Sequence, residues 1–165
     1  MTGNFLVKLF EHNNWANNQI IKACSTLSDE QLDTEPQSAT KGTIRETLTH
    51  LVNSQRGYLS LLTLTLEARH HAPPTFAGLQ ESAQISGEGL LALVRDESSK
   101  SPKTRLQTTD GFFVEPWVVM LQVINHATEH REQISSMLSA LGITPPDLDG
   151  WGYGEATNAL IPISK

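Results

Sequence analysis

The sequence has almost no cysteine, since Cys24 is the only thiol in 165 residues. No disulfide can form within the chain, and a metal cluster built on several cysteines is excluded. Cys24 itself lies beside the apolar face of a helical segment. We therefore interpret it as a small, inert core side chain rather than a nucleophile.

Long hydrophobic runs are also missing. No window approaches the roughly 18 uninterrupted apolar residues that a membrane helix needs. The short apolar run at residues 5–7 is ended by Lys8, before it could form the core of a signal peptide. We expect a cytoplasmic protein with no membrane association.

Basic residues are few and scattered. The chain has 12 Lys and Arg against 18 Asp and Glu, and its net charge of −6 disfavours sequence-independent nucleic-acid binding. It also lacks a glycine-rich phosphate loop and a nucleophile-elbow motif. Its apolar fraction of 38% is enough for one core of ordinary size, and we expect a single domain over residues 1–165.

Helical periodicity covers most of the chain. Apolar residues recur every three or four positions over about 4–27, 43–69, 79–98 and 116–141. Ser28–Gln31 and Thr43–Glu46 have the form of capping boxes, which predict a short helix through Leu32 and the start of the second long helix. Pro116 suits a first helical turn, and Gly142 suits a helix end.

These segments predict an all-α protein in which the long helices form an up-and-down four-helix bundle. Asp110-Gly111 predicts a turn before the last helix. If the chain contains a strand, we expect it at 112–114. The tail from about residue 147 contains three glycines and is predicted to be irregular.

The last helix carries two histidines on its apolar face. That face comprises Val119, Val123, His126, His130, Ile134, Met137 and Leu141. Histidines four residues apart stack one turn above the other and can aim two nitrogens at one metal ion. Burying two imidazoles costs free energy unless their nitrogens are occupied. The residues alone leave two interpretations open: a metal-binding pair, or two core histidines with separate hydrogen bonds.

A third metal ligand is harder to choose from the residues alone. His50 lies at the flank of the apolar stripe of the second helix, where it would border a groove or face solvent. His12, next to Asn13 on the first helix, is a rival. His70 and His71 follow the second helix, where a protonated imidazole would suit the helix dipole.

Glu129 gives the stretch from His126 to His130 the form H-x-x-E-H, which is the pattern of inverted zinc peptidases. That motif uses the glutamate as a base and needs a further acidic ligand, and this chain is small for such a peptidase. A solvated helix position is the simpler interpretation of Glu129.

Taken together, these motifs resemble the DinB/YfiT-like superfamily over almost the whole chain. They are Asn14–Asn17 and Leu27–Leu32, Thr47–Leu51, Asp110-Gly111 with Pro116-Trp117, Ile124–Ile134, and Leu141-Gly142 with Pro145-Pro146. The most specific is the His-x-x-x-His-Arg-x-x-Ile string that begins at His126. The chain departs from the family pattern at two places. Glu132 stands where many relatives have glycine, and residues 154–165 extend past the position at which relatives usually end.

The resemblance implies a four-helix bundle that binds one divalent metal through His50, His126 and His130. Imidazole ligands suit Zn, Ni or Fe, and the sequence does not select among these metals. Three protein ligands leave coordination positions open for water or substrate, as in catalytic rather than structural sites.

Some members of the superfamily resemble S-transferases that use a low-molecular-weight thiol. Our leading hypothesis is therefore a metal-dependent enzyme that activates such a thiol, or water, for attack on a small electrophile. Glu129 or Asn13 would contact the bound water or thiol. The alternatives are a non-catalytic, stress-associated metal-binding protein and a small metallohydrolase. The resemblance also favours a homodimer.

Overall fold

The predicted helices form in the computed structural model of the chain, which describes residues 5–37, 40–70, 72–96 and 105–163. The α-helices are α1 (Phe5–Cys24), α2 (Asp29–Leu32), α3 (Ile44–Thr63), α4 (Leu79–Arg95), α5 (Pro116–Ala140) and α6 (Gly150–Ala156). Short 3-10 helices at Leu66–Ala68 and Phe76–Gly78 (η1 and η2) link α3 to α4. None of the helices in these ranges has the length and apolar character needed to cross a membrane.

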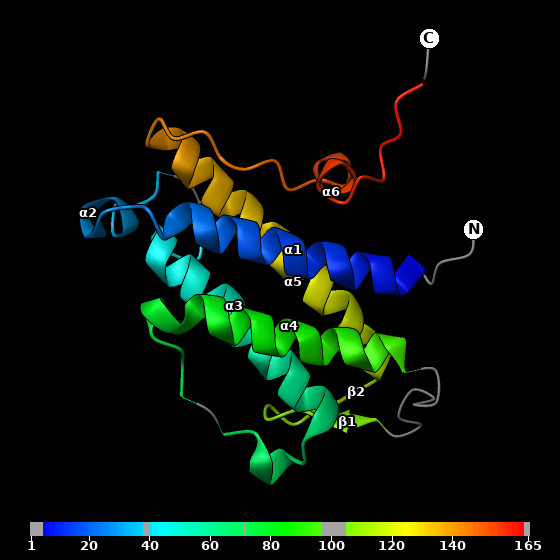
Figure 1. Cartoon of the computed structure of the whole chain (residues 1–165). Coiled ribbons are helices and arrows are strands. Elements are labelled where there is room, and N and C mark those ends of the chain that lie inside the picture. The colour runs from blue at the N-terminus through cyan, green and yellow to red at the C-terminus, as the bar shows by residue number, and fades with distance from the viewer. Residues whose placement is uncertain (1–4, 38–39, 71, 97–104, 164–165) are drawn as a thin grey trace.

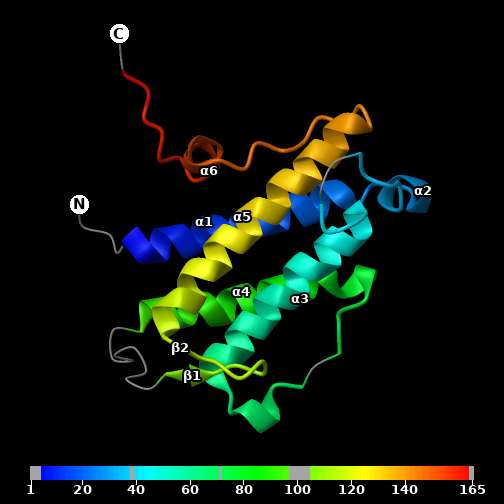
Figure 2. The same ribbon diagram turned by 180° about the vertical axis from the view of Figure 1, so that it is seen from behind.

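The four long helices lie in two layers (Figures 1 and 2). α1 and α4 run antiparallel in one layer, and α3 and α5 run antiparallel in the other. Each helix also contacts a helix of the opposite layer, α1 with α5 and α3 with α4. The mostly helical fold is therefore as predicted.

Local sequence signals fix where several helices begin and end. Both predicted capping boxes are present, with the side chains of Ser28 and Thr43 accepting hydrogen bonds from the backbone of Gln31 and Glu46. These bonds satisfy backbone donors that a helix start leaves free. The predicted stop after α5 is confirmed, since Gly142 has a φ of +74°, a conformation that glycine adopts without strain.

Two helix ends differ from the predictions. α3 ends at Thr63 rather than near 69, and the next residue, Leu64, has an extended backbone. α1 ends at Cys24 rather than near 27. The predicted end of α4 near 98 lies outside the described residues.

A small hairpin precedes α5. Strands β1 (Leu106–Gln107) and β2 (Phe113–Val114) pair antiparallel, with Leu106 opposite Val114. The predicted turn between them is confirmed, and Gly111 takes a positive φ of +91° there. The hairpin packs beside α3.

The prediction of an irregular tail was wrong for residues 150–156, which form α6. Asp149 caps this helix through hydrogen bonds from the backbone N–H groups of Trp151 and Gly152. The Tyr153 ring packs against the rings of His12 and Trp15 on α1. A cap and a tertiary contact thus offset the low helix propensity of the glycines.

A buried polar network crosses the core between the layers. The Arg131 guanidinium donates from Nη1 to Asn13 Oδ1 (2.8 Å) and Asn17 Oδ1 (2.6 Å). Asn17 Nδ2 donates to Gln55 Oε1 (2.8 Å), and Gln55 Nε2 donates to Ser86 Oγ (2.7 Å). Among the described residues, no carboxylate forms an ion pair with Arg131, and burial lowers its pKa to about 10. The Arg131 charge is therefore stabilised by neutral amide oxygens rather than by a carboxylate.

We predict that Arg131→Ala lowers the free energy of unfolding by about 3 kcal/mol, because it leaves buried amide groups without partners. Urea denaturation followed by circular dichroism measures the change. Arg95→Ala is the control, since Arg95 is half exposed in its 2.8 Å ion pair with Glu11. Its loss should cost less than about 1 kcal/mol. Equal effects of the two substitutions would contradict a structural role for the network.

Candidate metal centre

Three histidines from two helices meet between α3 and α5. His126 and His130 lie one turn apart on α5, and His50 lies on α3. The Nε2 atom of His126 is 3.0 Å from that of His50 and 3.1 Å from that of His130. One nitrogen of each ring can be chosen so that all three lie within 4.8 Å of one another. His130 is buried, and the other two are partly buried.

Two of the three nitrogen separations fit ligands of a shared transition-metal ion. Zinc–imidazole bonds of about 2.0–2.1 Å place two cis or tetrahedral nitrogen ligands about 2.9–3.4 Å apart. Both Nε2 separations from His126 fall in this range. The donor set is also suitable, because neutral imidazole is a common ligand for zinc, nickel and iron.

Hydrogen bonds among neutral rings cannot account for the whole cluster. His130 Nδ1 lies 2.7 Å from Gln133 Oε1, which accepts its proton and leaves a lone pair on His130 Nε2. If His126 Nε2 carries a proton, it can donate to His130 or His50, but a single N–H cannot serve both well. If it carries none, two lone pairs face each other across 3.1 Å. A cation among the nitrogens removes this conflict.

The protonation equilibria favour neutral rings. Burial, together with the nearby His130 and Lys41, lowers the pKa of His50. Burial is also the main cause that lowers the pKa of His126 to about 4, and the charges of His130, His50 and Lys41 act in the same direction. At neutral pH these two rings therefore keep lone pairs available for a metal.

The remaining predicted histidines lie elsewhere. His12 Nε2 is 2.7 Å from the Leu148 carbonyl oxygen, and its ring contacts Trp15 and Tyr153, so the rival third ligand has a separate structural environment. His70 is exposed and lies seven residues past the end of α3, so the predicted contact with that helix end is wrong. His71 lies outside the described residues.

The two candidate catalytic residues have environments of their own. Glu129 is exposed on α5, whereas Asn13 is buried on α1 and accepts a hydrogen bond from Arg131. Among the described residues, no hydrogen bond joins either side chain to the three histidines. Their roles toward water or thiol stay predictions.

Two neighbours of the cluster were missed from the sequence. Gln133 holds the His130 ring, and its position three residues after His130 on the same helix is a signal that could have identified it. Tyr58 packs edge-on against the His126 ring, with centroids 5.7 Å apart. Tyr58 lies two helical turns after His50, which could also have placed it near the cluster.

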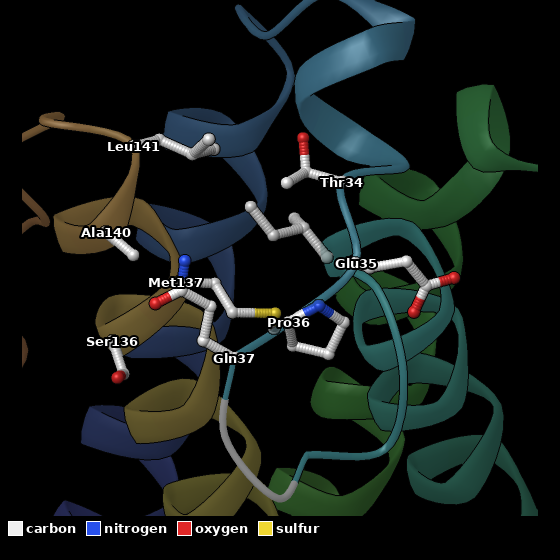
Figure 3. Close-up of a pocket in the computed structure, with 9 residues that line it drawn as sticks. Thr34, Glu35, Pro36, Gln37, Ser136, Met137, Ala140 and Leu141 are labelled. Carbon is white, nitrogen blue, oxygen red and sulfur yellow. The ribbon is translucent and has the colours of Figure 1, made fainter.

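Cavities lie on both sides of the cluster along α3 and α5. One, of about 250 Å³, lies between the loop that carries Pro36 and the last turns of α5 around Met137 (Figure 3). Met137 is seven residues from His130, which is about 10 Å along a helix. The other, of about 360 Å³, is lined by Asn53 and Ser54, one turn from His50, and by Tyr58. The second cavity is therefore nearer to the histidines.

Comparison with known proteins identifies one family. The model of the DinB family matches residues 1–162. No curated protein sequence gives a significant match.

Solved structures give the same picture of the fold. A protein from Exiguobacterium sibiricum assigned to the DinB family superposes with a TM-score of 0.67 at 19% identity, covering 90% of this chain and 100% of the other. A DinB-like protein from Bacillus cereus superposes with a TM-score of 0.60 at 16% identity, covering 86% of this chain and 94% of the other. At these identities the similarity concerns the fold alone.

Cys24 should not react in the native protein. The residue is fully buried, and burial raises the pKa of its thiol to about 12. At pH 8 we predict no labelling of folded protein by iodoacetamide and complete labelling in urea, as measured by mass spectrometry. Rapid labelling of the folded protein would contradict the interpretation of Cys24 as an inert core residue.

Proposed function

Because this chain belongs to the DinB family, we propose that it is a metal-dependent enzyme that activates a low-molecular-weight thiol or water for attack on a small electrophile. His50, His126 and His130 would hold one divalent ion, which is Zn, Ni or Fe in this proposal. The observation that carries it is the convergence of their nitrogens, 3.0 and 3.1 Å apart at His126.

A divalent ion bound by three imidazoles lowers the pKa of a coordinated water or thiol and leaves positions open for substrate. The chain's own residues would prepare this chemistry. Gln133 accepts the Nδ1 proton of His130, so that the ring presents its Nε2 lone pair. Tyr58 covers one side of the His126 ring and restricts its orientation.

The surroundings suit a negatively charged nucleophile. The charge of Lys41 reaches His50 and His126, since it contributes to lowering the pKa of both. This charge disfavours protonated histidine, and it would favour an anionic nucleophile over a neutral one.

The other elements of the proposal concern assembly. The four long helices would form an up-and-down bundle in which α3 and α5 supply the metal ligands. The substrate would be a small molecule, and two copies of the chain would associate as a homodimer in the cytoplasm.

The first test is metal content. Untagged protein should contain about one divalent ion per chain by elemental analysis, and His130→Ala should lose most of it. His12→Ala is the matched control, because His12 is also a partly buried helix histidine but bonds the Leu148 carbonyl oxygen. Equal metal contents in all three proteins would contradict the ligand assignment.

A second test separates a catalytic from a structural ion. His126→Ala should abolish metal binding and metal-dependent consumption of a low-molecular-weight thiol in the presence of a small electrophile, while the protein still folds. The competing hypothesis of a non-catalytic metal protein predicts the reverse, with a sharp fall in melting temperature and no thiol consumption by the wild type. A metallohydrolase would hydrolyse amide substrates without a thiol.

Gln133→Leu probes the support of His130. Removing the acceptor frees the ring to rotate or change tautomer, so metal affinity should fall by about 10–100-fold. Competition with a chelating indicator measures the affinity, and Ser136→Ala, at an exposed polar position nearby on α5, is the control. An unchanged affinity for Gln133→Leu would mean that this hydrogen bond does not orient the metal ligand.

A further inference from the structure

Arg69 differs from most arginines on the surface of this protein. Arg45, Arg95 and Arg105 each form an ion pair with a carboxylate. Among the described residues, Arg69 forms none. Its guanidinium is held by backbone carbonyl oxygens, with Nε donating to Leu64 and Nη1 to Gln107.

This anchoring fixes the guanidinium without neutralising its charge. A guanidinium has five N–H donors, and the described residues accept from only two of them, which leaves one hydrogen on Nη1 and both on Nη2. The charge of Arg69 contributes to lowering the pKa of Glu67, whose carboxylate also accepts hydrogen bonds from Thr65 and from its own backbone. Arg69 is therefore a preoriented cation with unused donors.

Arg69 also lines the cavity that extends along α3 from Asn53, which lies one turn after His50. This cavity of about 360 Å³ is of the size that holds a small ligand. Arg69 and the hairpin turn residue Thr109 line it together with Tyr58, whose ring contacts that of His126. None of its described lining residues is acidic. Positive charge and hydroxyl groups thus line one cavity, and the Tyr58 ring connects that cavity with the histidine cluster.

We propose that this cavity binds an oxyanion group of the substrate, a carboxylate or a phosphate, through the Arg69 guanidinium and the Thr109 hydroxyl. The reactive end of the same molecule then lies toward His50 and His126. This inference rests on the proposed function and specifies its substrate class. Arginine suits the task because its planar donors match two oxygens of one carboxylate or phosphate.

Calorimetric titration of the protein as purified tests the proposal, with succinate and inorganic phosphate as separate probes at constant ionic strength. We expect saturable binding of at least one anion, and the tighter probe identifies the preferred group. Arg69→Gln should weaken that binding at least about tenfold, since it removes a charge-assisted hydrogen-bond pair. Arg56→Gln is the matched control, because the Arg56 guanidinium also bonds a carbonyl oxygen, that of Ala72, but does not line this cavity.

A second variant keeps the test decisive if Arg69→Gln does not fold. Thr109 is exposed in the hairpin turn, so Thr109→Asp should fold normally and abolish anion binding by adding a negative charge at the cavity wall. No saturable binding of either anion, or unchanged binding in both folded variants, overturns the proposal. Metal content is measured in the same samples. Normal metal content without anion binding refutes only this inference, whereas a wild type without metal refutes the proposed function.

Discussion

The mutual approach of three imidazoles is the constraint on which the account of this protein depends. Neutral rings with nitrogens 3.0 and 3.1 Å apart cannot all be satisfied by hydrogen bonds to one another once Gln133 accepts the proton of His130. Burial also disfavours protonation of two of the rings, since it lowers the pKa of His50 and lowers that of His126 to about 4. A shared cation satisfies all three lone pairs at once, and the positions of α3 and α5 set the geometry for it.

The buried arginine network explains how α5 could hold that geometry. His130 and Arg131 are neighbours in sequence and point about 100° apart around the helix. His130 joins the cluster with α3, whereas Arg131 bonds Asn13 and Asn17 on α1. Rotation of α5 would break both sets of contacts. The polar core therefore fixes the angle at which the histidines face α3, although it contributes no group to the cluster.

Local signals predicted much of the fold, because helix periodicity and caps depend on neighbouring residues. Ser28, Thr43 and Gly142 marked helix ends correctly, and the resemblance to the family was confirmed by the match over residues 1–162. Contacts between distant segments were harder to predict. α6 depends on the packing of Tyr153 against α1, and the flank position of His50 did not reveal which side chains it would meet. The cavity beside the histidines combines α3 with a hairpin turn some fifty residues later in the chain, which no local pattern indicates.

Anomalous diffraction from crystals of the untagged protein, collected above and below the absorption edge of the metal found in it, tests the central claim most directly. The account predicts one strong peak about 2.0–2.1 Å from the Nε2 atoms of His50, His126 and His130. A peak bound to other residues, or three histidine rings joined by direct contacts in a protein that carries its metal elsewhere, would contradict it.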